Sequence, residues 1–152
     1  MYKYLVTGGA GFIGSSVIRN LLIHGDCEVI NIDDLTYAGN LENLLSVEAN
    51  KNYHFRKVNI IDSEKTEKII KEFQPDFIMH LAAESHVDRS IDDPSIFIQT
   101  NIIGTFNLLE ATRKYLASIS KDKASNFRFH HISTDEVFGS LGENGLFDEE
   151  TK

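Results

Sequence analysis

The sequence predicts an α/β protein built on a doubly wound parallel sheet of about five strands, in the order 3-2-1-4-5. Two observations lead to this prediction. A glycine-rich string, Thr7-Gly-Gly-Ala-Gly-Phe-Ile-Gly14, stands between a run of β-forming residues and a helical pattern. Runs of β-forming residues then alternate with helical patterns along the rest of the chain. This alternation favours a Rossmann-like sheet, in which ligands bind at the carboxyl ends of the strands.

The first strand and the first helix enclose the glycine-rich string. Tyr2–Val6 is rich in β-forming residues, so it is expected to form the first strand. From Ile13 to His24 apolar residues recur at helical spacing, and Gly25 is a suitable residue to end that helix. The glycines therefore lie at a strand-to-helix turn, which is the setting of a phosphate-binding loop.

Each glycine of the string has a different expected task. Gly8 allows the tight turn, Gly11 lets the backbone approach a pyrophosphate, and Gly14 lets the helix pack closely on the strand. The N–H groups of the first helical turn, at Phe12 and Ile13, would face the diphosphate. The alternative is an ordinary glycine-rich turn, but the strand, the helix and the acidic residue downstream favour cofactor binding.

That acidic residue is Asp33, which closes a second expected strand, Val29–Ile32, 19 positions after Gly14. A carboxylate there accepts hydrogen bonds from the ribose hydroxyls and repels a 2′-phosphate, so it favours NAD over NADP. The alternative is a solvated aspartate at a strand end. Residues 34–40 are expected to form a loop and residues 41–47 a short helix.

A third strand is expected from Tyr53 to Ile60, followed by a helix that Asp62 or Ser63 caps and Pro75 stops. The buried face of this helix is predicted from residues spaced i, i+3, i+4 and i+7, namely Thr66, Ile69, Ile70 and Phe73.

The second half of the chain continues the alternation. Residues 77–80 read as a fourth strand and residues 81–90 as a polar, irregular segment. A long helix is expected from Pro94 to about Ala117, because proline suits a first helical turn. A polar loop at 118–126 then leads to a fifth strand at 127–132.

Composition limits the classes of protein to which the chain can belong. At 152 residues it has the length of one domain. The net charge of −8 argues against nucleic acid or an anionic membrane as a partner. A single cysteine, Cys27, excludes an internal disulfide and suits a reducing cytoplasm. No apolar run reaches the roughly 18 residues of a membrane helix, so a soluble, cytoplasmic protein is expected.

Four strings of the chain closely resemble those of the dTDP-glucose 4,6-dehydratases, which are extended short-chain dehydrogenases/reductases. The strings are Thr7–Gly14, Asn31–Asn40, His80–Ile91 and His131–Gly139. The resemblance covers essentially all 152 residues, and the last two strings are more specific than the glycine loop. It implies the cofactor NAD, the substrate dTDP-glucose and a homodimer for the full-length enzyme.

The resemblance also implies a reaction and the residues that perform it. In the family, C4 of glucose is oxidised, water leaves across C5 and C6, and the hydride returns to C6. Carried over, Asp135 protonates the departing C6 hydroxyl, Glu136 removes the C5 proton, and Thr134 polarises the C4 oxygen. For its role Asp135 must stay protonated near neutral pH, which requires desolvation or a like-charged neighbour. The alternative for this pair is solvated surface charge.

Further site residues come from the resemblance. Those expected along the adenosine half are Asp34, Leu35, Thr36, Asn59 and Ile60. Leu81, Ala82 and Ala83 are expected over the pyrophosphate and the nicotinamide ribose, Thr100 at the cofactor, and Ser85 at the substrate. His86, Asp88 and Arg89 belong to the family string, where a bracing role for the loop is the favoured interpretation. No metal site is expected, because the histidines lack metal-ligand spacing.

The chain departs from the family pattern in three places. Asn59 stands where the family usually has an aspartate that accepts from the adenine amino group, so weaker binding is expected. Phe138 replaces a tyrosine. The catalytic Tyr-x-x-x-Lys of the helix after the fifth strand is missing, and the one match, Tyr53 to Lys57, falls in the expected third strand. Residues 1–152 are therefore expected to be the NAD-binding, N-terminal piece of a longer enzyme, without its sugar-nucleotide-binding part.

Two other functions remain open from the sequence. One is a non-catalytic NAD-binding module, which the missing tyrosine and lysine favour. The other is a related nucleotide-sugar dehydratase or 4-epimerase, although an epimerase has no need of the Asp135–Glu136 pair because it eliminates nothing.

Overall fold

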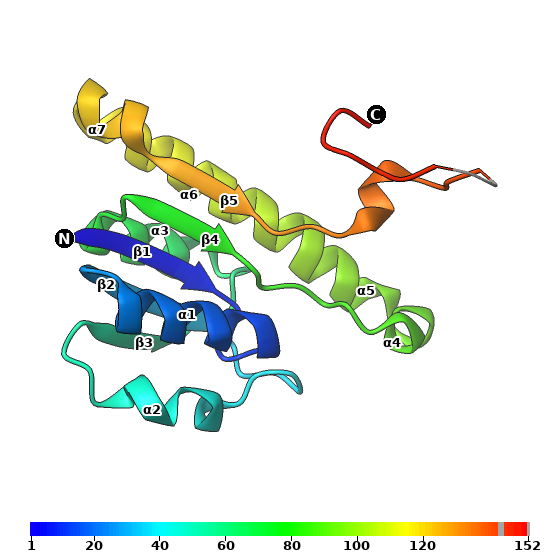
Figure 1. Ribbon diagram of the computed structural model, residues 1–152, viewed down its shortest axis with the longest axis horizontal. Coiled ribbons are helices and arrows are strands. Elements are labelled where there is room, and N and C mark those ends of the chain that lie inside the picture. The colour runs from blue at the N-terminus through cyan, green and yellow to red at the C-terminus, as the bar shows by residue number, and fades with distance from the viewer. Residues whose placement is uncertain (143–144, 152) are drawn as a thin grey trace.

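The computed structural model describes residues 1–142 and 145–151 and confirms the predicted sheet (Figure 1). Its five strands are all parallel and lie in the order β3-β2-β1-β4-β5. They are β1 (Tyr2–Thr7), β2 (Cys27–Asp33), β3 (Tyr53–Lys57), β4 (Phe77–His80) and β5 (Arg128–His131). The chain reverses its direction of travel across the sheet between β1 and β4, so the point where ligands bind in such sheets lies beside the loop after β1.

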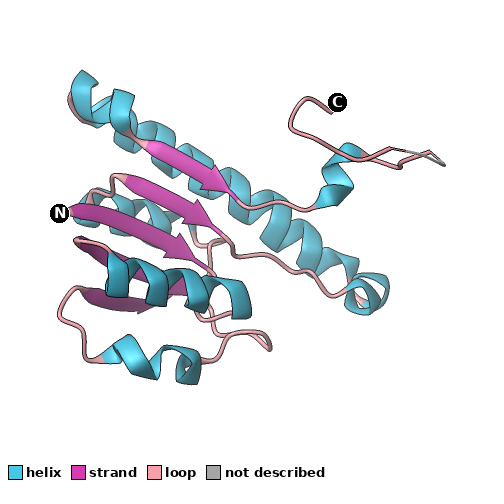
Figure 2. Ribbon diagram, in the orientation of Figure 1, coloured by secondary structure: helices cyan, strands magenta, loops and turns pink. Residues whose placement is uncertain are grey.

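Helices cover both faces of the sheet (Figure 2). One face carries α1 (Phe12–His24) and α2 (Leu45–Glu48), the latter preceded by a 3₁₀ turn at Leu41–Leu44. The other face carries α3 (Ser63–Phe73) and α6 (Thr105–Ser118). The shorter helices are α4 (Val87–Asp92), α5 (Pro94–Phe97) and α7 (Lys121–Asn126), and a π-helical turn at Ile98–Gly104 joins α5 to α6.

Two hydrophobic clusters hold these layers together, because successive side chains of a strand point to opposite faces. Leu5 of β1 belongs to the cluster beneath α3 and α6, whereas its neighbour Val6 belongs to the cluster beneath α1 and α2. The predicted buried face of α3 is confirmed, since Thr66, Ile69, Ile70 and Phe73 are all buried. Asp62 caps that helix by accepting a hydrogen bond from the Lys65 N–H at 3.0 Å.

Four segments differ from the predictions. The third strand ends at Lys57 rather than Ile60, because its partner β2 ends at Asp33 and, among the described residues, no other strand pairs with β3. The expected long helix is present as continuous helical backbone from Pro94 to Ser118, but its hydrogen bonding is of the π type over Ile98–Gly104, where Gly104 packs against Ile60. A Cβ on Gly104 would lie 2.6 Å from Cγ1 of Ile60, so only glycine allows this approach.

Helices α4 and α7 occupy segments that were expected to be irregular. The short α7 is capped by Ser120, whose hydroxyl accepts from the Lys123 N–H at 3.3 Å. No side-chain cap supports α4, which begins after His86. Neither helix has the apolar periodicity on which a prediction from the sequence depends, and α7 has no buried residue.

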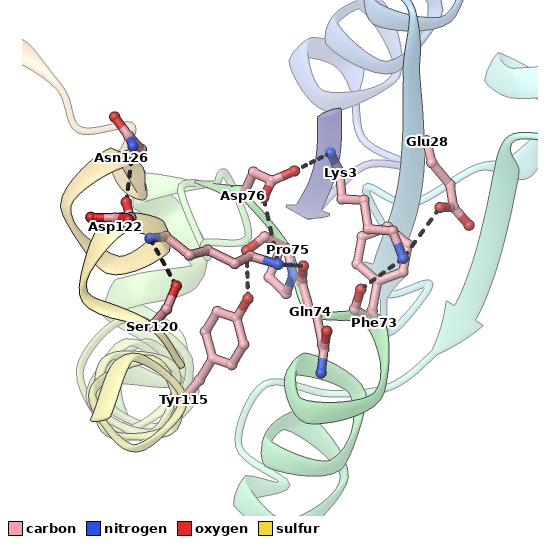
Figure 3. A network of polar contacts seen from close by, with 11 residues as sticks. Lys3, Glu28, Phe73, Gln74, Pro75, Asp76, Tyr115, Ser120, Asp122 and Asn126 are labelled. Atoms are coloured by element: carbon pink, nitrogen blue, oxygen red, sulfur yellow. Dashed lines mark hydrogen bonds and ion pairs between the residues drawn. The ribbon is translucent and has the colours of Figure 1, made fainter. Parts of the chain in front are cut away.

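A polar network joins the elements at the amino ends of the strands (Figure 3). The Lys3 N–H donates to Oδ2 of Asp76 at 2.9 Å, and Nζ of Lys123 forms an ion pair with Oδ1 of the same carboxylate at 3.6 Å. The Tyr115 hydroxyl of α6 donates to the Pro75 carbonyl at 3.0 Å. These contacts fix the loop before β4 at the amino end of the sheet, opposite to the carboxyl ends of the strands.

Within the described residues, no helix combines the length and the apolar character needed to cross a membrane.

Candidate functional site

A cavity of about 310 Å³ opens at the carboxyl ends of the strands. This volume is at the lower end of the roughly 300–1,000 Å³ of typical ligand sites. The residues predicted to bind the cofactor that line it are Gly8, Gly11, Phe12, Ile13, Gly14, Asp33, Asp34, Thr36, Asn59, Ile60, Leu81, Ala82, Ala83 and Thr100. Ser85, predicted to reach the substrate, lines it as well. The fold thus gathers residues from the segments after all five strands, together with Thr100 of the π-helical turn, around one space.

The glycine loop leaves room beside its backbone. Gly8 has φ +71°, a conformation that side chains disfavour, and Gly14 lies so close to the loop that a Cβ would come 2.2 Å from the Gly8 carbonyl oxygen. By contrast, a Cβ on Gly11 would meet only the Gly8 and Ala38 carbonyl oxygens, at 3.3 and 4.0 Å. The space over Gly11 is therefore open to a ligand, in keeping with the role predicted for it.

The first turn of α1 offers N–H groups to this space. Gly11 caps the helix without a side chain, and the first helical hydrogen bond runs from the Ser15 N–H to the Gly11 carbonyl at 3.0 Å. In the described part of the chain, no acceptor occupies the N–H groups of Phe12, Ile13 and Gly14. Free N–H groups and the positive end of a 13-residue helix form a setting that suits a phosphate or diphosphate.

Asp33 connects the end of β2 to the glycine loop. Its side chain is 8% exposed, and its Oδ2 accepts from the Ala10 N–H at 2.9 Å. Its Oδ1 accepts from the Leu35 N–H at 2.8 Å. Leu35, alone among the predicted cofactor residues, does not line the cavity, and it adopts a left-handed conformation with φ +54°. Its place in the site is thus to present an N–H to Asp33.

Asp34 and Asn59, from the segments that follow β2 and β3, form a hydrogen-bonded pair in the lining of the cavity. Nδ2 of Asn59 donates to Oδ2 of Asp34 at 2.8 Å, and Oδ1 of Asn59 accepts from the Ile61 N–H at 2.9 Å. Both side chains are half-buried and both line the cavity. The amide of Asn59 is therefore fixed in one orientation by a donor and an acceptor.

His80 joins three segments behind the cavity, a role that the sequence did not indicate. Its Nδ1 lies 2.7 Å from Oγ1 of Thr7 and its Nε2 lies 2.9 Å from Oγ1 of Thr105. The same Thr7 oxygen accepts from the Ala82 N–H at 3.2 Å, so the Thr7 hydroxyl is free to donate to Nδ1. Burial, together with the neighbouring His131, lowers the pKa of His80 to about 4. The ring is hence neutral near pH 7 and acts as a structural link.

Glu84 lines the cavity and is a second residue that sequence reasoning missed. It is 6% exposed, and its main chain is held by Asn101, which accepts from the Glu84 N–H and donates to its carbonyl, both at 2.8 Å. Among the described residues, its Oε2 has no hydrogen-bond partner. A glutamate within a string of small residues carries no sequence signal for burial, since glutamate is seldom buried.

The predicted acid–base residues lie beside the cavity but do not line it. Thr134 precedes a 3₁₀ turn at Asp135–Phe138, shortly after β5, and makes no capping hydrogen bond with its side chain. Ile132, two residues earlier, does line the cavity. Thr134, Asp135 and Glu136 are exposed, so the described residues do not supply the desolvation that an acid role for Asp135 requires. Their catalytic roles stay predictions.

Tyr53 and Lys57 are not a displaced catalytic pair. Both lie on β3, where four residues along a strand span roughly 13 Å. The Tyr53 hydroxyl accepts from Nδ2 of Asn31 at 3.1 Å, and burial raises the pKa of this phenol. A raised pKa is the opposite of what an activated phenolate needs, which agrees with the interpretation of this match as chance.

The strand order, the glycine loop and the carboxylate at the end of β2 together define a Rossmann-like α/β fold, a fold that commonly binds dinucleotides. A family model described as GDP-mannose 4,6 dehydratase matches residues 5–152, so the chain belongs to that family.

Curated relatives narrow the comparison to one group of enzymes. The chain is 56% identical over 139 residues to the dTDP-glucose 4,6-dehydratase of Salmonella typhimurium, which covers 91% of this chain and 38% of the relative. The chain thus spans about two-fifths of the length of the curated relatives that it matches, and the homology lies in their N-terminal part.

Two solved structures complete the comparison. The dTDP-glucose 4,6-dehydratase of Streptomyces venezuelae, with NAD and TYD bound, is 41% identical with a TM-score of 0.84, over 99% of this chain and 44% of that one. The UDP-glucose 4-epimerase of Thermotoga maritima, with UDP-glucose, is 42% identical with a TM-score of 0.67, over 74% of this chain and 34% of that one.

Proposed function

We propose that this chain is the NAD-binding part of an enzyme that dehydrates dTDP-glucose to dTDP-4-keto-6-deoxyglucose. The observation that carries the proposal is the position of Thr134, Asp135 and Glu136 directly after β5, beside a cavity lined by the predicted cofactor residues. Identity of 56% with a dTDP-glucose 4,6-dehydratase supports the same reaction.

The residues of the cavity suit NAD. The open space over Gly11 and the free N–H groups of α1 fit a diphosphate, and the carboxylates that follow β2 fit an unphosphorylated ribose. The S. venezuelae relative binds NAD with the same fold. When bound, NAD supplies a hydride acceptor for C4 of the sugar and a hydride donor for C6.

The residues after β5 would then carry the proton transfers. Thr134 would donate to the C4 oxygen and favour the ketone that acidifies the C5 proton. Glu136 would remove that proton, and Asp135 would protonate the C6 hydroxyl as it leaves as water. Since both carboxyl groups are exposed in this chain, the closure that desolvates Asp135 must come from groups outside it.

The decisive experiment is to read the gene past Lys152, express the complete product and assay it with dTDP-glucose. We expect a Tyr-x-x-x-Lys within about thirty residues and formation of the 4-keto-6-deoxy product, with the usual helix after the fifth strand. Asp135→Asn and Glu136→Gln should each lower kcat by about 10²–10⁴-fold while NAD binding is unchanged. A complete product that lacks the motif, or that forms no 4-keto sugar, would overturn the proposal.

An epimerase is the second candidate, favoured by 42% identity to the T. maritima UDP-glucose 4-epimerase. The product distinguishes the two, because an epimerase returns the hydride to C4 and loses no water. A third candidate is a non-catalytic NAD-binding module, an alternative that the sequence left open. It predicts NAD binding by the complete product without any turnover.

We also propose that the complete protein is a homodimer that pairs through α6. An apolar strip runs along the outer side of the π-helical turn and α6, with Ile98 50%, Ile102 55%, Phe106 58% and Leu109 47% exposed. Monomeric proteins rarely expose a continuous strip of this kind. The same helix packs on the sheet through Gly104, Leu108 and Ala111, which are buried, so the strip is a separate face.

A further inference from the structure

Two of the segments that line the cavity also meet each other outside it. From the loop after β2, the lining residues are Thr36, Ala38 and Gly39. From the segment after β4, they are residues 81–85. Tyr37 of the loop does not line the cavity, and neither does Arg89 of α4. Instead the guanidinium carbon of Arg89 lies 3.9 Å from the centre of the Tyr37 ring, so the two segments are joined by their side chains.

The contact between Arg89 and Tyr37 has the geometry of a cation–π interaction, in which the cation lies within about 6 Å of the ring centre. Arg89 is half-buried, and partial removal of a guanidinium from water strengthens such a contact. His86, the residue before α4, approaches the same tyrosine edge-on, with ring centroids 6.5 Å apart and an angle of 83° between the ring planes. Tyr37 is therefore held by two residues of the same segment.

The loop after β2 is anchored at its base by hydrogen bonds, whereas Tyr37 stands near its tip. The Asn40 N–H donates to the Ala10 carbonyl at 3.0 Å, and the Gly39 N–H closes a turn on the Thr36 carbonyl at 3.0 Å. On the other side, α4 has six residues and no side-chain cap. A helix this short is not stable by itself, so the packing of Arg89 on Tyr37 also helps to fix α4.

We propose that Arg89 and Tyr37 form a clasp that holds two walls of the cavity together and slows the release of a bound dinucleotide. Opening of the clasp frees the loop after β2 to move away from the segment after β4. This inference rests on the NAD-binding part of the proposed function. The proposed reaction returns the hydride to the sugar and regenerates NAD in every cycle, so slow release of the cofactor does not limit turnover.

The rate at which this chain releases NADH tests the clasp. NADH is fluorescent, and excess NAD displaces it in a stopped-flow experiment. The chain has no tryptophan, so protein fluorescence adds little background. Arg89→Met removes the cation and keeps a long apolar side chain. It should raise the release rate by about two- to fivefold, the factor expected for an exposed cation–π contact, with a smaller change in the association rate.

Arg113→Met is the matched control. It removes an exposed arginine of α6 that forms an ion pair with Glu110 and does not line the cavity. The release rate of this variant should equal that of the unmutated chain. A rise as large as that of Arg89→Met would assign the effect to net charge and overturn the clasp.

Substitutions at position 37 show which part of the tyrosine acts. Tyr37→Phe keeps the ring face and should release NADH at close to the unmutated rate, whereas Tyr37→Ala should behave like Arg89→Met. The double variant Tyr37→Ala with Arg89→Met should release NADH no faster than either single variant, because both changes remove the same contact. Independent effects of the two changes, or equal rates for Tyr37→Phe and Tyr37→Ala, would contradict the clasp.

Hydrogen exchange of the ligand-free chain gives a readout that does not depend on binding. The amides of residues 36–39 should exchange faster in Arg89→Met than in the unmutated chain, because the loop opens more often. Arg113→Met should leave their exchange unchanged. Faster exchange together with an unchanged release rate would reduce the contact to a brace of the loop and overturn its role in retaining the ligand.

The outcomes separate this inference from the proposed function. If the unmutated chain binds NADH and Arg89→Met releases it at the same rate, the clasp is wrong and the NAD-binding part of the proposed function stands. If the unmutated chain binds neither NADH nor NAD, the clasp and the cofactor part of the proposed function fail together.

Discussion

Oγ1 of Thr7 lies 2.7 Å from Nδ1 of His80, at the buried junction of β1, β4 and the start of α6. Through this contact a neutral imidazole ties the residue before the glycine loop to the segment that carries Ala82. The pKa of His80 is lowered from 6.5 to about 4. Between these two pH values the ring is therefore protonated in the unfolded chain but neutral in the folded chain. The stability of the fold should therefore depend on pH through this one histidine.

The free energy of unfolding should therefore fall as the pH drops from about 6.5 to about 4. In this range the unfolded chain binds a proton at position 80 and the folded chain does not, so protonation favours unfolding. The loss of unfolding free energy that His80 causes should reach about 3 kcal/mol near pH 4 and change little at lower pH.

Urea unfolding at several pH values measures this effect, with His80→Gln as the comparison. The variant keeps a donor and an acceptor but has no titrating ring, so its stability curve should be flatter over the same pH range. Parallel curves for the two proteins would show that His80 does not carry the effect.

Gly11→Ala and Gly14→Ala should have different effects, because the space beside Gly11 is open to a ligand whereas the space beside Gly14 is filled by the protein. Ala at position 14 places a Cβ 2.2 Å from the Gly8 carbonyl oxygen, so it should destabilise the fold by about 1–3 kcal/mol or more. Ala at position 11 meets no atom closer than 3.3 Å, so the fold should tolerate it. Instead it should weaken NAD binding at least about tenfold, because its methyl group enters the open space. Thermal unfolding and calorimetric titration give the two readouts, and an effect of Gly11→Ala on stability alone would count against the phosphate-site interpretation.

Asp33→Ala should act on both specificity and stability. Loss of the carboxylate should narrow the preference for NAD by weakening NAD binding. It also leaves the N–H groups of Ala10 and Leu35 without their acceptor, which should cost about 1–3 kcal/mol. Titration with NAD and NADP checks the first effect and urea unfolding the second. Equal affinities of the unmutated chain for the two cofactors would remove Asp33 from its predicted role.

Most of the fold could be predicted from local patterns, because the glycine loop and the alternation of strands and helices are written in consecutive residues. The carboxylate of Asp33 was predictable for the same reason. Its two backbone partners were not, since Leu35 reaches Asp33 only through a left-handed turn. The link through His80 joins residues that are 73 positions apart in one bond and 25 in the other, and no sequence periodicity encodes it.

The π-helical turn illustrates a further limit of local prediction. Residues 94–117 have a helical pattern throughout and do form a continuous helix, but the pattern does not indicate the π-helical segment at Ile98–Gly104, where Gly104 packs against Ile60 from another segment. The pairing of Asp34 with Asn59 depends likewise on the adjacency of β2 and β3. Contacts of this kind form only when distant segments pack together. They determine which side chains of the site are hydrogen-bonded to each other, whereas the strand order determines where the site lies.

The 152-residue chain should fold and bind NAD but should not convert dTDP-glucose. Its five-stranded sheet has two hydrophobic clusters that support it. Its sequence does not contain the Tyr-x-x-x-Lys that the family carries on the helix after the fifth strand. Tyr53 on β3 cannot replace that tyrosine, because its pKa is raised and it does not line the cavity. Incubation of the purified chain with NAD and dTDP-glucose should yield no 4-keto product. Appearance of that product would show that other residues supply the base.

The exposed strip on the π-helical turn and α6 should make the chain self-associate. Phe106 lies in the middle of the strip and is 58% exposed, while Leu108 on the other side of the helix is fully buried. A charge at position 106 therefore disfavours burial of the strip in an interface without disturbing the contact with the sheet. Sedimentation at micromolar concentration should find a dimer or larger species for the unmutated chain and a monomer for Phe106→Glu.

Ser46→Glu, which adds the same charge to the exposed side of α2 on the opposite face of the sheet, is the control and should stay associated. A monomer in the unmutated chain would contradict association through this helix. Equal dissociation by both variants would assign the effect to net charge rather than to the strip.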